Sequence, residues 1–194
     1  MGVFLNIACL FCIGCTFGWI IEVIFRRFYS GNNRERRWIN PGYLTGPWLP
    51  VYGFGLCALY LLSGIEGLLP VSGALGKLLL IIVMTLSVTA VELFAGLVSV
   101  YLLKATLWDY SGEWGNFKGL ICPKFAFFWG IICALYLFLF HPLLVSLTDW
   151  LSLHAEFSIF AGIYLGFLLA DALGLDFSRG KSFSLTFDKI RSIF

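Results

Sequence analysis

The chain has 194 residues, of which 60% are hydrophobic and 12% charged, and its formal net charge is +2. This balance is typical of membrane proteins and excludes an ordinary soluble globular domain. We expect no nucleic-acid partner, because the basic residues lie in loops between apolar segments and form no recognition motif. The composition therefore predicts an integral membrane protein of the all-α class, with the lipid bilayer as its first partner.

Apolar segments predict about five spanning helices, over residues 3–25, 47–69, 78–103, 125–144 and 157–177. A helix needs about 20 residues to cross a bilayer. A cleavable signal peptide has a basic residue before its apolar segment, and the first segment here has none. We therefore expect this segment to be retained. We interpret residues 1–178 as one polytopic transmembrane helical bundle and residues 179–194 as a cytoplasmic tail. In the tail, helical spacing of four apolar residues predicts an amphipathic surface helix: Phe183, Phe187, Ile190 and Phe194.

The distribution of positive charge predicts the orientation of the chain. With five crossings, the loops after the first and third segments share one side with the tail, and together they hold 12 of the 13 lysines and arginines. Loops rich in lysine and arginine stay in the cytoplasm. We therefore expect a multi-pass protein of the cell membrane, with its N-terminus outside and its C-terminus in the cytoplasm.

Two connections between the predicted spans have signals of their own. Residues 38–50 contain Pro41, Pro47 and Pro50 among apolar and aromatic residues. Proline opposes a regular helix, so this segment predicts a re-entrant or interfacial loop. Residues 141–155 predict a short helix that lies on the outer membrane interface.

Glu92 is the main candidate for a functional residue, because it lies near the middle of an otherwise uncharged apolar segment. A carboxylate at that depth costs about 2.5–3.5 kcal/mol, which makes it a functional-site candidate by default. Five small or polar residues share its helix face by their spacing: Thr85, Thr89, Glu92, Gly96 and Ser99. We expect this face to look into the protein and not at lipid.

Two further acids lie close to the ends of apolar segments. Glu22 follows Gly14 and Gly18 on one helix row and can pair with Arg26. Because glycines allow close helix approach, we expect Glu22 to face another helix, either as a structural ion pair or as part of a site. Asp171 lies beside a row of small residues, Gly162, Gly166, Ala170 and Gly174, which predicts tight packing; capping or pairing and a site role both remain open for it.

Most of the remaining polar and aromatic residues lie in the predicted cytoplasmic loops. Trp108, Asp109 and Tyr110 follow the third segment, and arginines that include Arg37 follow the first. Such rings and charges form either an interfacial aromatic belt or a vestibule that binds a cation. The six cysteines show no metal-ligand spacing, so we expect no metal and no cofactor.

Several motifs occur in a fixed order along residues 14–130. They are GWIIE at 18–22, NPGYLTGPWLPVYGFG at 40–55, Glu92, WDYS at 108–111, NFKGLIC at 116–122 and WG at 129–130. This set resembles the bacterial membrane-protein family described as "Putative ABC-transporter type IV". The resemblance implies a membrane subunit that works with a separate ATPase, since the chain has no P-loop spacing of its own. It marks as site candidates Glu22, Asn40, Glu92, Trp108, Asp109 and Tyr110.

Our leading hypothesis is a transport or substrate-binding subunit with an acidic site that opens toward the cytoplasm. Its pocket would lie between the first, third and fifth spans, where Glu92 binds a small-molecule ligand through a cationic group, or a proton. Arg26, Arg37 and Asp171 would act as gating or structural pairing residues. A membrane enzyme acting on a lipid or lipid-linked substrate is the alternative, with paired carboxylates as acid and base and loop arginines holding a phosphate. The third hypothesis is a sensor or assembly partner without turnover. No catalytic constellation and no ATPase motif favours an enzyme.

Overall fold

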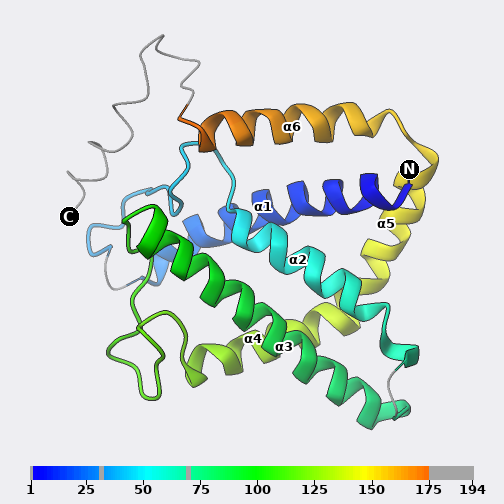
Figure 1. The fold of residues 1–194 in the computed structure, drawn as a ribbon, viewed down its shortest axis with the longest axis horizontal. Helices are drawn as coiled ribbons and strands as arrows, with labels where there is room; N and C mark the ends of the chain where they lie inside the picture. Colours follow the sequence, from blue (N-terminus) through cyan, green and yellow to red (C-terminus); the bar gives the residue numbers. More distant parts are fainter. Residues whose placement is uncertain (1, 31–32, 69–70, 175–194) are drawn as a thin grey trace.

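The computed structural model describes residues 2–30, 33–68 and 71–174, and these residues form helices joined by loops (Figure 1). The predicted all-α class is confirmed, since the described residues form no named strand. The elements in chain order are α1 (Gly2–Phe28), α2 (Pro50–Ser63), the 3-10 helix η1 (Glu66–Leu68), α3 (Gly73–Leu97), the π-helix η2 (Val98–Leu102), α4 (Pro123–Leu135), the π-helix η3 (Tyr136–Phe140), α5 (His141–Leu153) and α6 (Phe157–Ala172). The tail 179–194 and its predicted surface helix lie outside the described residues.

The helices pack in the spatial order α6, α1, α2, α3 and α4. Figure 1 shows α6 and α1 side by side, with α2 and α3 below them, and α5 running across the right-hand end of the bundle. There α5 contacts α1 and η3. The loops that follow α1 and α3 gather at the opposite end, so the fold separates a loop end from an α5 end.

Three helices in the described ranges are long and apolar enough to cross a membrane: Val3–Phe28, Gly73–Leu102 and Pro123–Leu153. The number of helices of spanning length in these ranges is therefore lower than the five that we predicted. Large apolar side chains cover the outside of these helices, as lipid contact requires; Phe4 is 81% and Phe94 is 70% exposed. The helices thus have the composition and surface of a membrane protein.

The helices α2 and α6 are shorter than the segments predicted for them, and both differences have local causes. The helix α2 has 14 residues and begins only at Pro50, because a proline in the first helical position keeps the residue before it, Leu49, in an extended conformation. The helix α6 has 16 residues and ends at Ala172, two residues before Gly174, whose φ of 71° is left-handed. At 1.5 Å per residue they measure about 21 and 24 Å, against about 30 Å of hydrocarbon.

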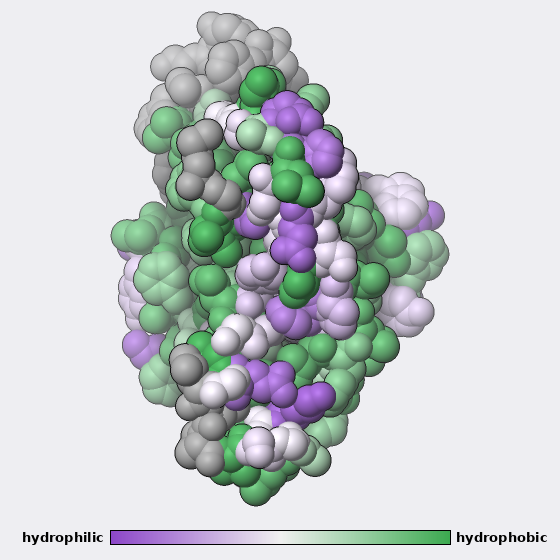
Figure 2. Space-filling model, turned by 90° about the vertical axis from the view of Figure 1, so that its right-hand side faces the viewer, coloured by the Kyte–Doolittle hydropathy of each residue, from purple (hydrophilic) through white to green (hydrophobic). Residues whose placement is uncertain are grey.

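The predicted short helix over 141–155 exists as α5, but it continues from α4 through η3 without an interruption. Its polar residues include Ser146, Asp149 and Ser152. Figure 2 shows the end of the molecule at which α5 lies, and a band of hydrophilic residues runs down it between apolar flanks. This arrangement agrees with the expectation of an interfacial helix, whose position at a membrane surface stays a prediction.

The main apolar core lies between α2, α3, α4 and η3. Its buried residues are Leu59, Leu80, Met84, Val88, Cys133, Tyr136 and Leu137. By contrast, two glycines of the small-residue row on α6 are open: a Cβ atom added to Gly162 or Gly166 would meet no atom of the described residues within 4 Å. The prediction of tight packing through these glycines is therefore wrong, because α6 packs against α1 through another face that includes Ala161 and Leu168.

Candidate functional site

The polar face of α3 points into the protein, as its spacing predicts. Glu92 is only 6% exposed and Ser99 only 2%. A Cβ atom on Gly96 would lie 3.0 Å from Leu120, and one on Gly130 of α4 would lie 3.5 Å from the hydroxyl of Thr85. The face is therefore covered by α4 and by the loop that follows η2.

The carboxylate of Glu92 accepts a hydrogen bond on each oxygen. The Tyr110 hydroxyl donates to Oε1 at 3.0 Å, and the Trp129 indole Nε1 donates to Oε2 at 2.9 Å. Both donors are neutral. Within the described ranges, no lysine, arginine or histidine nitrogen lies within 4.0 Å of this carboxylate. The carboxylate is thus hydrogen-bonded, but the described part of the chain places no cation within ion-pairing distance of it.

Tyr110 reaches Glu92 because the 108–122 loop is a compact, hydrogen-bonded structure. The Tyr110 amide donates to the Gly119 carbonyl at 2.8 Å, and the Trp108 indole donates to the Leu120 carbonyl at 3.0 Å. Gly119 has a φ of 70°, a left-handed conformation that glycine adopts without strain. The ring of Tyr110 also stacks on Phe125, with centroids 4.2 Å apart. The motif residues around Tyr110 therefore build the loop that holds it.

Other polar residues of the 108–122 loop bond within the loop. Asp109 is exposed, and its Oδ1 accepts from the amide of Ser111 at 2.8 Å and from its hydroxyl. These bonds lower the pKa of the Asp109 carboxyl, because they favour its ionised form. Burial and the nearby Glu92 carboxylate raise the pKa of the Tyr110 hydroxyl, so it remains a donor. Trp108 and Asp109 thus bond to loop atoms, whereas Tyr110 contacts the buried acid.

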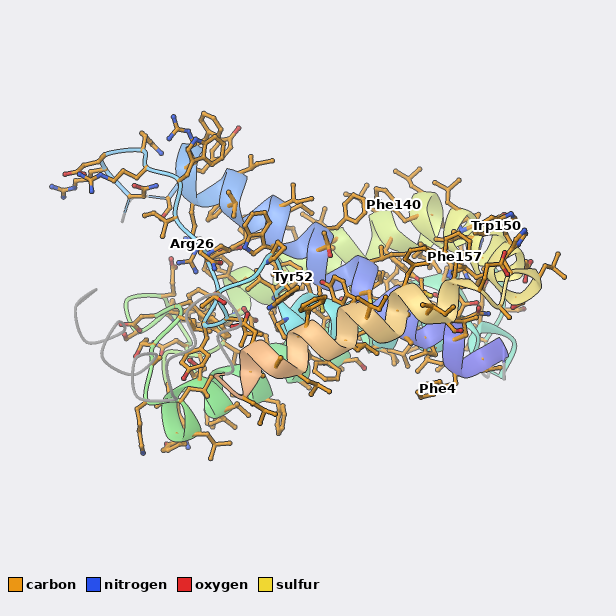
Figure 3. The ribbon with its side chains drawn as sticks, turned by 90° about the horizontal axis from the view of Figure 1, so that it is seen from above. Phe4, Arg26, Tyr52, Phe140, Trp150 and Phe157 are labelled. Atoms are coloured by element: carbon orange, nitrogen blue, oxygen red, sulfur yellow. The ribbon has the colours of Figure 1, made fainter. Side chains whose placement is uncertain are left out.

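Glu22 faces the contact between α1 and α2, as the glycine row predicts. The Tyr52 hydroxyl of α2 donates to its Oε2 at 3.1 Å, and Arg26 donates to its Oε1 at 3.1 Å. A Cβ atom on Gly18 would lie closer than 3.0 Å to the Tyr52 ring, so only glycine leaves room for that ring. Arg26, seen at the loop end of Figure 3, also donates to the Leu107 carbonyl at 3.3 Å. Glu22 is therefore both ion-paired and joined to α2.

Aromatic contacts connect the two acids. The rings of Tyr52 and Trp129 are in edge contact, with centroids 6.4 Å apart and planes at 65°. Glu22, Tyr52, Trp129, Glu92 and Tyr110 consequently form one continuous group, which we call the acidic–aromatic cluster. It contains two carboxylates and three rings, and Arg26 balances only one of the charges. A surplus negative charge of this kind suits a cation or a proton.

Asn40 and Asp171 belong to a different network, outside the acidic–aromatic cluster. The Asp171 carboxylate accepts from the Thr45 amide at 3.2 Å, the Thr45 hydroxyl at 2.7 Å, the Gly46 amide at 2.9 Å and the Trp48 indole at 2.8 Å. The Asn40 amide group donates to the carbonyls of Leu44 and Thr45. These bonds shape the irregular 38–49 segment and attach it to α6.

The structure brings together only some of the residues that the sequence marked. Glu22, Arg26, Glu92 and Tyr110 lie in or against the cluster, whereas Arg37 pairs with exposed Glu35 at 2.6 Å. The sequence reasoning missed Tyr52 and Trp129, although both fall within the quoted motifs. Their spacing could not show that their polar tips reach acids on other helices. The cluster lies between α1, α2, α3 and α4, and α6 contributes nothing to it among the contacts of the described residues.

Apolar helices with lipid-type surfaces and a buried acidic cluster define an all-helical membrane protein. The chain belongs to the family described as "Putative ABC-transporter type IV", whose model matches residues 9–174. The family resemblance read from the motifs is therefore confirmed, and it extends beyond them into α6. No curated protein and no solved structure matches the chain. The family relates the protein to membrane transport.

Proposed function

We propose that the chain is a transport or substrate-binding subunit whose Glu92 carboxylate binds a cationic group or a proton. The observation that carries this proposal is a buried carboxylate with two neutral donors and no cation within 4.0 Å in the described part of the chain. A carboxylate buried without a positively charged partner is costly even when it is hydrogen-bonded. Uptake of a cation or a proton would lower that cost.

The rings of the cluster support the two acids through their polar edges. Trp129 and Tyr110 donate hydrogen bonds to Glu92, and Tyr52 donates one to Glu22. Glu22 keeps its own partner in Arg26, so it would hold Tyr52 in position and leave Glu92 as the binding group. This division of roles follows from the charges, because Arg26 pairs with Glu22 and, among the described residues, no cation pairs with Glu92.

We infer that access runs through the 108–122 loop. Tyr110 is the loop's donor to Glu92, and moving the loop outward would withdraw it and uncover the carboxylate. The loop end of the bundle carries Lys118 and Lys124, and the positive-inside rule places such a segment in the cytoplasm. The site would then open toward the cytoplasm. A separate ATPase or other membrane subunit, which the family description suggests, would supply the energy or complete the assembly.

The test uses the purified protein in liposomes that contain a pH-sensitive dye. An imposed proton gradient measures proton movement, and tetramethylammonium chloride tests cation binding through tryptophan fluorescence, to which Trp129 contributes. We expect the wild type to respond in at least one assay and Glu92→Gln to lose that response at least tenfold. The matched control is Glu66→Gln, since Glu66 is an exposed acid in η1.

Two outcomes contradict the proposal. Equal responses of the wild type and Glu92→Gln would show that this carboxylate does not bind the ion. Equal losses in Glu92→Gln and Glu66→Gln would show that the response reports general charge and not the buried site.

A further inference from the structure

A groove along α1 is lined by residues that do not belong to the acidic–aromatic cluster. A groove of about 470 Å³ runs between α1 and residues 38–40, and its lining is almost entirely apolar. Trp19 and Trp38 form parts of its walls, together with Ile20, Val23, Ile24 and Ile39. Several of these side chains are open to the surroundings, since Trp38 is 64% and Ile24 is 45% exposed. The groove therefore offers an apolar surface to a molecule outside the protein.

The polar residue of the lining, Asn40, has no bonding capacity left for a ligand. Its Oδ1 accepts from the Trp19 indole at 2.9 Å and from the Gly42 amide at 3.3 Å. Its Nδ2 donates to the carbonyls of Leu44 and Thr45 at 2.8 and 3.2 Å. An amide group has two donor hydrogens and two acceptor positions, and all four are used. The occupant that fits such a surface is a hydrocarbon chain.

The loop after α1, which supplies part of the groove's lining, is strongly basic in sequence. Residues 26–40 contain five arginines and a single acid, Glu35, which gives a formal charge of +4. Arg26 and Arg37 pair with Glu22 and Glu35, but no described carboxylate lies within 4.0 Å of Arg27, Arg34 or Arg36. In Figure 3 this loop projects beyond the end of α1 with nitrogen-tipped side chains around it.

One arginine of this basic segment contacts the lining of the groove at Trp38. The Arg27 guanidinium lies 4.5 Å from the centroid of the Trp38 ring, and that ring lines the groove. The Arg27 cation can attract an anionic head group, and the apolar groove beside it can hold an acyl tail. Tryptophan rings favour the depth at which lipid head groups begin.

We propose that this groove binds an anionic phospholipid of the membrane, with an acyl chain between α1 and residues 38–40 and its phosphate beside Arg27 and Arg34. Charge complementarity selects the head group, because basic residues at a membrane surface attract anionic lipids and not zwitterionic ones. The proposal is independent of Glu92. The groove would anchor the loop after α1 to the lipid leaflet in which it lies.

Native mass spectrometry of the purified protein tests this site, using equimolar phosphatidylglycerol and phosphatidylcholine with identical acyl chains. We expect the wild type to retain phosphatidylglycerol in preference. One arginine contributes roughly a fivefold preference, so Arg27→Gln should lower the preference about fivefold, whereas Lys77→Gln, at the other end of the bundle, should not. Arg34→Gln is a second variant, because Arg34 is exposed and its loss disturbs less of the loop than that of Arg27, which bonds to the Arg36 carbonyl.

The groove itself is tested by filling it. Ile24→Trp places a large ring in the groove and should reduce retention of both lipids, while Ile21→Trp, on exposed α1 surface outside the lining, should not. Equal retention of the two lipids by the wild type would overturn the choice of head group. Equal effects of the two tryptophan substitutions would overturn the groove as the binding site.

Discussion

The hydrogen bond from Tyr110 to Glu92 gives a quantitative test of whether this acid is held as an anion. Tyr110→Phe removes the hydroxyl that donates at 3.0 Å but keeps the ring that stacks on Phe125. A hydrogen bond to a charged group contributes about 1.5–3 kcal/mol, and one between neutral groups about 0.5–1.5 kcal/mol. We therefore expect Tyr110→Phe to cost about 2 kcal/mol in the wild type and about 1 kcal/mol in Glu92→Gln.

The free energy of unfolding of the four proteins in this cycle can be measured by titrating detergent-solubilised protein with sodium dodecyl sulfate while following tryptophan fluorescence. The coupling free energy between the two positions should be about 1 kcal/mol, above the roughly 0.5 kcal/mol within which independent changes add. Tyr101→Phe is the control, since the Tyr101 side chain is 56% exposed. Additive effects in the cycle would refute a charged acceptor at Glu92.

Two further predictions concern the contacts between helices. Gly18→Ala should destabilise the protein by about 1–3 kcal/mol, because its Cβ would lie within 3.0 Å of the Tyr52 ring. Gly162→Ala should stabilise it by up to about 1 kcal/mol, because no atom of the described residues lies within 4 Å of the added Cβ. Equal unfolding free energies for these two variants would contradict the close approach of α1 and α2. Asp171→Asn should lower the unfolding free energy by about 1–3 kcal/mol and speed trypsin cleavage of residues 34–37, because it weakens four bonds to the 45–48 segment. Exposed Asp149→Asn should change both by little, and a similar effect of the two variants would argue against the attachment.

Part of the candidate site could be predicted because it depends on features local to one helix. The spacing of Glu92 with its small and polar neighbours predicted a face that avoids lipid, and the structure buries Glu92 and Ser99 on that face. The row through Gly18 to Glu22 likewise predicted a close helix contact, which Tyr52 makes. In both cases helix geometry alone decides which residues share a face.

The same reasoning failed where a pattern has more than one structural outcome. The small residues on α6 share a face, but no helix covers Gly162 or Gly166 in the described part of the chain. The sequence did not decide whether Asp171 has a site role or a pairing role. In the structure its carboxylate bonds to residues 45–48, the segment before α2. A row of glycines permits close packing but does not supply the partner, which only the arrangement of helices provides.

The sequence by itself determined that this is an all-helical membrane protein, where its longest helices lie and which acid is deepest in them. These properties follow from the composition and from the helical spacing of apolar and polar residues, because the bilayer requires long apolar helices and makes a central charge costly. The tertiary structure alone decided that Tyr110 and Trp129 bond to Glu92, and that Asn40 and Asp171 shape a separate loop. Those contacts join residues far apart in the chain, so they depend on how the helices pack and not on any local pattern.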